Sequence, residues 1–135
     1  MEINLLAVVF SAIATMIIGF AWYSPMLFGK IWTRDMRISS QLLRSARGRG
    51  LSAAYLLSFF TSLVMAYTLS ALFKLVGILT LSQALQVTLL LWLGLVVTVK
   101  TTEALYSGKP VRLYFIDIIY ELTSLTVTTL IIFFV

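Results

Sequence analysis

The stretch Leu113–Val135, LYFIDIIYELTSLTVTTLIIFFV, decides the fold class. It is long and apolar enough to cross a bilayer as a helix, because the hydrocarbon core takes about 20 mostly apolar residues to span. It nevertheless contains two acids, Asp117 and Glu121. The segment therefore predicts a transmembrane helix, and it raises the question of what two carboxylates do inside one.

Three further stretches of the chain meet the same length and composition rule, at about residues 3–23, 51–73 and 81–99. Hydrophobic residues make up 61% of the 135 residues and charged residues 11%, against roughly 25% charged residues in soluble domains. We therefore predict an all-α integral membrane protein whose residues 1–135 form one domain, a bundle of four transmembrane helices.

The composition also excludes several kinds of chemistry. The chain has no Cys and no His, which removes disulfides, zinc–thiolate sites, imidazole acid–base catalysis and thiol nucleophiles. We predict no catalytic residues, no cofactor and no bound metal. A lipid-modifying enzyme using Asp35, Glu103 and Asp117 is a remaining hypothesis, although no nucleophile elbow or phosphate-binding glycine loop is present.

The basic residues predict the orientation in the membrane. Nine of the ten Lys and Arg residues fall between the first and second spans or near the connection of the third and fourth, and Lys74 alone falls on the other side. The positive-inside rule makes the basic side cytoplasmic. We therefore predict a multi-pass protein of the cell membrane with both termini outside. The net charge of +5 is then a topology signal, and we predict no nucleic-acid partner.

The connection between the first two spans is patterned. Apolar and basic residues alternate at helical spacing over about residues 27–46, which predicts a basic amphipathic helix lying in the membrane interface. Lys and Arg in such a helix attract anionic lipid headgroups. The candidate headgroup contacts are Lys30, Arg34, Arg37 and Arg44.

The first span contains small residues at every fourth position, namely Ala7, Ser11, Thr15 and Gly19. Rows of this kind allow helices in lipid to approach closely. We predict that this small-residue ridge is a helix-packing face, either within the bundle or against another membrane protein.

The last span has a polar stripe, because Tyr114, Asp117, Glu121, Ser124 and Thr128 recur at three- and four-residue spacing. Glu121 lies about 13 Å beyond Arg112 along the helix axis, near the middle of the hydrocarbon core. Depth matching across the hairpin at Gly108 predicts an ion pair between Lys100 and Asp117. Glu121 is left with hydroxyl neighbours, drawn from Tyr55, Ser58 and Ser62 or from Ser11 and Thr15.

These residues define the candidate intramembrane site. Its members are Lys100, Tyr114, Asp117, Tyr120, Glu121 and Ser124. Intramembrane acids are functional candidates by default. Two interpretations stay open at this point. Either the polar groups join helices, with a neutral Glu121 donating a hydrogen bond, or they line a path for protons, a cation or a small basic solute.

Two strings point to a family. WYSPMLFGKIW at Trp22–Trp32 and LYSGKPVRLYFIDIIY at Leu105–Tyr120, in a chain of four spans, resemble the bacterial and archaeal membrane family called domain of unknown function 1761. The matching residues are Trp22, Tyr23, Pro25, Phe28, Gly29, Lys30 and Trp32 in the first block and Gly108, Lys109 and Pro110 in the second. The resemblance implies the four-span fold and implies no activity.

Two further function classes follow from the sequence. The first is a non-enzymatic channel- or permease-like protein that acts as a homo-oligomer in the lipid bilayer, because four short helices rarely enclose a pore alone. The alternative is a structural or interaction subunit that binds another membrane protein through the small-residue ridge. No motif identifies a solute.

Overall fold

The computed structural model describes residues 3–24, 26–31 and 51–135, and every regular element in these ranges is a helix. The helices are α1 (Leu5–Trp22), α4 (Leu51–Val76), α5 (Leu81–Leu91), η1 (Trp92–Val97), α6 (Thr98–Ser107) and α7 (Val111–Phe134). Because α5, η1 and α6 are continuous, the described chain has four helices long and apolar enough to cross a membrane. The predicted four-span, all-α membrane architecture is confirmed. Most of the predicted interfacial helix, including Arg34, Arg37 and Arg44, lies outside the described residues.

Two glycines end helices, and one of them, Gly108, is the predicted hairpin position. Gly77 follows α4 with a φ of 80°, and Gly108 follows α6 with a φ of 70°. These left-handed conformations carry little cost for glycine and are strained for other residues. Thr80 then begins α5, where its hydroxyl accepts from the Gln83 backbone and the Gln83 side chain accepts from the Thr80 backbone. This capping box satisfies backbone donors at the start of the third span.

The third span is longer than predicted and is not a uniform α-helix. It continues to Ser107, and its middle turn, η1, has π-helical geometry. A π-helical turn contains one more residue than an α-helical turn, so it rotates all later side chains around the axis. Residues after Val97, Lys100 among them, therefore face differently from a straight helical projection.

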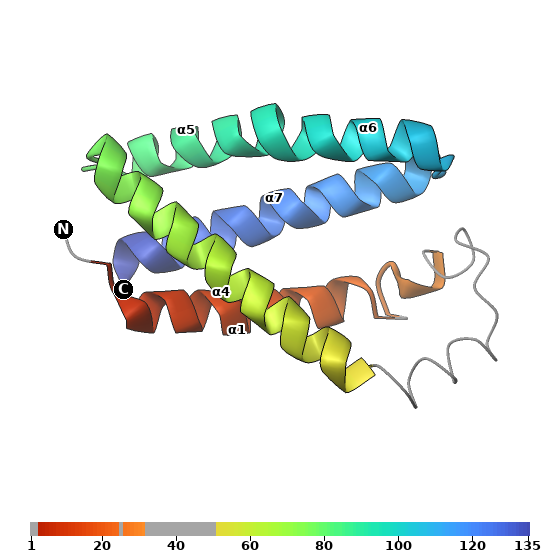
Figure 1. Cartoon of the computed structure of the whole chain (residues 1–135), viewed down its shortest axis with the longest axis horizontal. Coiled ribbons are helices and arrows are strands. Elements are labelled where there is room, and N and C mark those ends of the chain that lie inside the picture. Colours follow the sequence, from red (N-terminus) through yellow and green to blue (C-terminus); the bar gives the residue numbers. More distant parts are fainter. Residues whose placement is uncertain (1–2, 25, 32–50) are drawn as a thin grey trace.

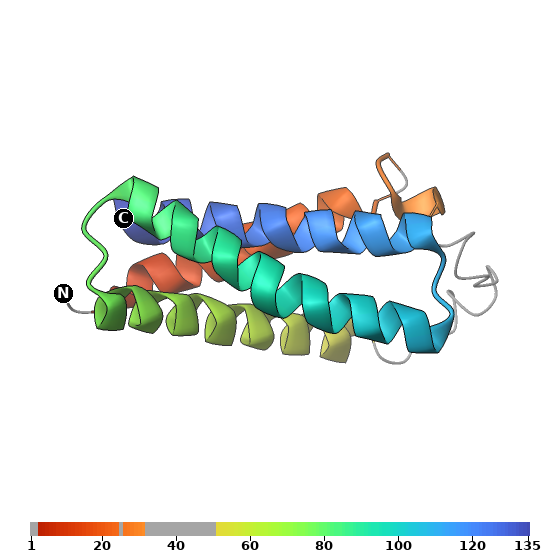
Figure 2. The same ribbon diagram turned by 90° about the horizontal axis from the view of Figure 1, so that it is seen from above.

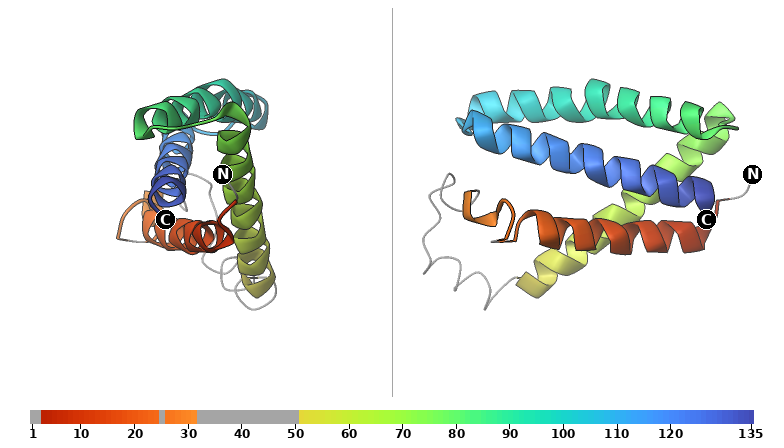
Figure 3. Two further views of the ribbon diagram at one scale, coloured as in Figure 1. Left: turned by 90° about the vertical axis from the view of Figure 1, so that its left-hand side faces the viewer. Right: turned by 180° about the vertical axis from the view of Figure 1, so that it is seen from behind.

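The helices form an open array. In Figure 1, α7 lies between α1 and the α5–η1–α6 helix, and α4 crosses in front at a steep angle. α4 packs mainly on α1 and only lightly on α7, whereas α5 and η1 pack on α7. Figure 2 and Figure 3 show both chain ends at one end of the bundle and the α6–α7 turn at the other. This agrees with an even number of spans.

Small residues let α1, α4 and α7 approach closely. Ser11, Ala12, Ala66 and Thr128 are buried, and the Ser11 hydroxyl donates to the Ala7 carbonyl at 2.7 Å. On the other face of α7, Thr88 and Thr129 share a hydrogen bond of 2.5 Å, and Trp92 donates to the Ile118 carbonyl at 2.7 Å. Such contacts are what joins helices in lipid, where apolar burial contributes little.

The chain folds back tightly after α1. The Phe28 amide donates to the Trp22 carbonyl at 3.0 Å, and the Gly29 amide donates to the Ser24 carbonyl at 2.9 Å. Trp22 packs on Phe28 and donates from its indole nitrogen to the Ile116 carbonyl of α7 at 3.2 Å. This turn therefore fixes the end of α1 against the first half of α7.

We predict that Gly29→Ala destabilises the protein by about 1–3 kcal/mol, as overpacking does. A Cβ atom at this position would lie 2.3 Å from the Tyr23 carbonyl oxygen and 2.7 Å from the Ser24 backbone, so the turn must open. Gly94→Ala is the matched control, because a Cβ there meets nothing within 4 Å. Thermal unfolding in detergent measures both, and equal midpoints for the two variants would contradict the tight-turn account.

Candidate functional site

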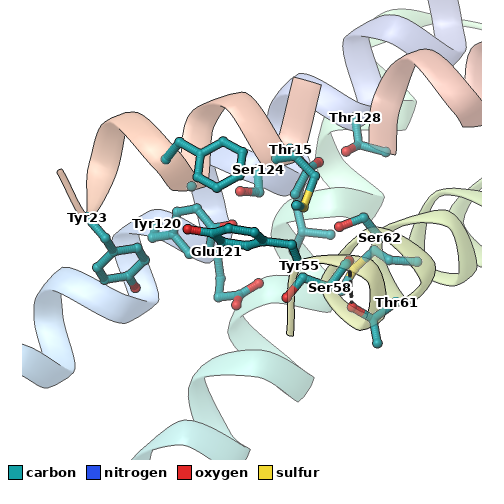
Figure 4. A pocket seen from close by; sticks show the side chains of 15 residues that line it. Thr15, Tyr23, Tyr55, Ser58, Thr61, Ser62, Tyr120, Glu121, Ser124 and Thr128 are labelled. Atoms are coloured by element: carbon teal, nitrogen blue, oxygen red, sulfur yellow. Dashed lines mark hydrogen bonds between the residues drawn. The ribbon is translucent and has the colours of Figure 1, made fainter. Parts of the chain in front are cut away.

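A pocket of about 470 Å³ lies between α1, α4 and α7. It extends along α7 from Tyr120 to Thr128, a length of about 12 Å at 1.5 Å per residue. Tyr23 lines it at the basic end of the bundle. Phe20 and Tyr55 line it too and are 49% and 42% exposed, so the pocket is not sealed by protein. Figure 4 shows the labelled polar side chains that converge on it from the three helices.

Nine of the fifteen residues that line the pocket bear a hydroxyl group. The hydroxyl-bearing residues are Thr15, Tyr23, Tyr55, Ser58, Thr61, Ser62, Tyr120, Ser124 and Thr128. Among the described residues that line the pocket, Glu121 is the single acid, and Lys and Arg are absent. The neighbours expected for Glu121 from the second span, together with Thr15, do share the pocket with it. Ser11 does not, because it is buried at the α1 packing face.

Glu121 lies near the middle of α7 and has no close counter-charge. Lys100 attracts its carboxylate and Asp117 repels it, but among the described residues no cation lies within ion-pair distance of Glu121. A carboxylate inside a bilayer needs a partner, water or a proton. The pocket is therefore the space from which a counter-charge, a proton or water can reach the Glu121 carboxylate.

Ser124 supplies a second unsatisfied group, one helical turn further along α7. Its side chain is 6% exposed, and its Oγ atom has no hydrogen-bond partner. The Tyr120 hydroxyl lies nearby on the same helix, but the Ser124 Oγ atom makes no hydrogen bond of normal length and angle. Buried hydroxyls are normally paired, so a polar group placed in the pocket would have a hydrogen-bond partner at Ser124.

Asp117, by contrast, is fully engaged. One carboxylate oxygen accepts from the Tyr23 hydroxyl at 2.7 Å, and the other forms an ion pair with Lys109. The side chain of Asp117 is only 9% exposed and that of Lys109 17%. Asp117 therefore lies outside the pocket lining and ties the turn after α1 to the turn before α7.

The predicted Lys100–Asp117 ion pair is wrong, because Lys109 takes the place assigned to Lys100. The prediction matched depths across the hairpin, but depth alone does not set which face a side chain occupies. The π-helical turn at Trp92–Val97 rotates Lys100. Lys109 reaches Asp117 without a match in depth across the hairpin. It lies in the turn directly before α7, and its long side chain extends along that helix to Asp117.

Tyr23 follows the last residue of α1, and its hydroxyl is a hydrogen-bond donor. Burial raises the pKa of this phenol above its ordinary value, and the hydrogen bond to Asp117 raises it further. The hydroxyl therefore keeps its proton at neutral and mildly alkaline pH. Asp117 receives one neutral and one cationic donor.

Only some of the other predicted site residues lie at the Glu121 pocket. Tyr120 lines the pocket with Glu121 and Ser124, and its ring lies 5.3 Å from that of Tyr23. Tyr114 faces α6, where its hydroxyl hydrogen-bonds Thr101. In the small-residue ridge, Ala7 is buried like Ser11, whereas Thr15 and Gly19 line the pocket. Lys30 is exposed.

Sequence reasoning missed the partners of Asp117. Tyr23 belongs to the Trp22–Trp32 block and Lys109 to the Gly108–Pro110 turn, so the two blocks that resemble a known family meet at this carboxylate. The presence of both blocks in one chain was the sequence signal from which a contact between them could have been predicted. Among the described residues, no group of three His, Cys, Asp or Glu side chains is arranged to hold a metal ion.

These features define a four-span membrane protein with a hydroxyl-lined pocket around an intramembrane acid. The chain matches, over residues 6–133, the model of the family described as protein of unknown function (DUF1761), and it belongs to this family. No curated protein and no solved structure matches the chain.

We predict that Lys109→Met lowers the free energy of unfolding by about 1–3 kcal/mol, because it leaves a buried carboxylate without its cation. The double variant Lys109→Met/Asp117→Asn should recover most of this loss, since an amide still accepts from Tyr23 and carries no charge.

Unfolding in mixed micelles of increasing SDS fraction measures these changes. Lys74→Met is the control, because Lys74 is exposed at the opposite end of the bundle. The ion-pair account fails if the double variant is as unstable as Lys109→Met, or if Lys109→Met behaves like the control.

Proposed function

We propose that the protein is a non-enzymatic, permease-like membrane protein that binds a cationic solute or a proton at Glu121. The observation that carries the proposal is the open pocket of about 470 Å³ around an acid that has no close counter-charge. A carboxylate kept only for packing would be satisfied by a neighbouring side chain, as Asp117 is. Glu121 instead faces space that a solute or water can occupy.

The placement of a second pocket supports a transport path. A cavity of about 220 Å³ lies at the other end of the bundle, between Asn4, Ser70 and Ile132. Between the two pockets, the same three helices pack through buried Ser11, Ala66 and Leu69. Such packing separates the two pockets, and a separation of this kind is compatible with the alternating access that transport proteins use.

The distribution of lysine residues between the two ends of the bundle orients the proposed path relative to the membrane. Lys30 and Lys109 lie at the end where Tyr23 lines the larger pocket, and Lys74 lies at the opposite end. If the basic side is cytoplasmic, as the positive-inside rule predicts, the proposal places the Tyr23 end of the pocket toward the inside of the cell and both termini outside. We also propose that the basic residues between the first two spans contact anionic lipid headgroups on this side.

A homo-oligomer is part of the proposal, because one chain does not enclose a pore. α4 packs chiefly on α1, whereas α5 and η1 pack on α7. Leu90, Leu93 and Val99 remain exposed along the third span. This face offers a surface on which a second copy of the chain can pack in the bilayer.

The interaction-subunit alternative is less favoured. Its expected docking surface was the small-residue ridge of the first span, but Ala7 and Ser11 are buried against the chain's own helices. Thr15 and Gly19 face the pocket. A partner protein would therefore need a different surface.

Flux into proteoliposomes tests the proposal. With a pH-sensitive dye inside and imposed proton and alkali-cation gradients, wild type should carry a flux that Glu121→Gln abolishes, because the amide cannot hold a cation or release a proton. Glu103→Gln is the control, since Glu103 is exposed on α6 and outside the pocket. Flux that is equal in wild type and Glu121→Gln, or absent from both in correctly inserted protein, would overturn the proposal.

A further inference from the structure

The size and donor set of the Glu121 pocket limit what can occupy it. Its volume of about 470 Å³ falls in the range of organic small-molecule sites, about 300–1,000 Å³. Hard metal cations instead need a close shell of about six to eight oxygens, with several carboxylates or carbonyls. The pocket offers one carboxylate among hydroxyls. This donor set fits an organic molecule better than a divalent metal ion.

The apolar part of the wall fits an organic body beside a positive charge. Met16, Met65 and Leu125 line the pocket, as does Phe20. Phe20 and Tyr55 form an edge-to-face pair with ring centroids 5.0 Å apart. Aromatic faces attract cations, and thioether side chains adapt to varied apolar shapes. An amphipathic cation matches this combination better than a sugar or an anion.

The buried hydroxyl specifies the kind of cation. Ser124 lies three residues after Glu121 on the same helix, so both side chains occupy one face of α7. Its Oγ atom is buried without a partner, and it can accept a hydrogen bond from an N–H group held at Glu121. A primary ammonium has three such donors, whereas a quaternary ammonium has none.

Building on the permease-like function proposed above, we propose that the pocket binds a primary organic ammonium ion. Its charged NH₃⁺ group lies between the Glu121 carboxylate and the Ser124 hydroxyl. Its apolar body packs against Phe20 and Met65, both of which line the pocket. The ammonium supplies the counter-charge that Glu121 lacks and the donor that Ser124 lacks.

Isothermal titration of the purified protein in detergent at neutral pH tests this proposal. The probes are benzylammonium, its uncharged analogue benzyl alcohol and potassium chloride, each corrected for a detergent blank. Benzylammonium should bind at least about tenfold more tightly than benzyl alcohol, because a charge-assisted hydrogen bond contributes more than a neutral one.

Variants separate the two contacts. Glu121→Gln should weaken benzylammonium binding about tenfold or more. Ser124→Ala should weaken benzylammonium but leave benzyltrimethylammonium unchanged, because the latter has no N–H donor. Thr123→Ala is the matched control, since this neighbour donates to the Ile119 carbonyl and does not line the pocket. Thermal midpoints of the free proteins show that each variant is folded.

The outcomes separate this inference from the function on which it rests. Equal binding of benzylammonium and benzyl alcohol, or binding unchanged in Glu121→Gln, overturns the inference. Glu121-dependent potassium binding or proton flux without benzylammonium binding overturns the inference alone and leaves the permease-like function standing. Absence of ligand binding together with absence of Glu121-dependent flux overturns both.

Discussion

A carboxylate in the middle of a bilayer must be neutral, paired or in contact with water, and the rest of this structure depends on how the chain treats two of them. Asp117 is paired, because Lys109 and Tyr23 both donate to it. Glu121, about one helical turn deeper in α7, has neither partner and faces a pocket. The same helix thus contains one acid that joins elements of the fold and another that is open to an occupant.

The contacts around Asp117 fix the position of helices that form the pocket wall. Tyr23 contacts Asp117 through its hydroxyl and Tyr120 through its ring, and Trp22 donates to the backbone of α7. These contacts fix the end of α1, which carries Gly19 and Phe20 of the pocket wall. The Asp117 centre is therefore structural support for the Glu121 pocket. It connects the Trp22–Trp32 and Leu105–Tyr120 blocks of sequence to the candidate site.

The sequence predicted the existence of the four spans, because bilayer thickness and helical rise fix how many apolar residues a spanning helix needs. The sequence also predicted the turn at Gly108. The partner of Asp117 could not be predicted from the sequence. The π-helical turn at Trp92–Val97 leaves no recognised signal in the sequence, and it rotates the side chains that follow it around the helix axis. The pocket also depends on the steep crossing of α4 over α1 (Figure 1), which a helix-by-helix pattern does not specify.

The account's central claim is that Glu121 faces a space open to solutes, and cysteine accessibility tests it most directly in a chain that has no native Cys. Ser62→Cys lines the pocket, whereas Val64→Cys lies two residues away on an exposed apolar face. The account predicts that Ser62→Cys in membranes reacts with aqueous methanethiosulfonates, faster with a cationic than an anionic reagent, and that Val64→Cys does not react. Unreactive Ser62→Cys, or equal rates at the two positions, would contradict it.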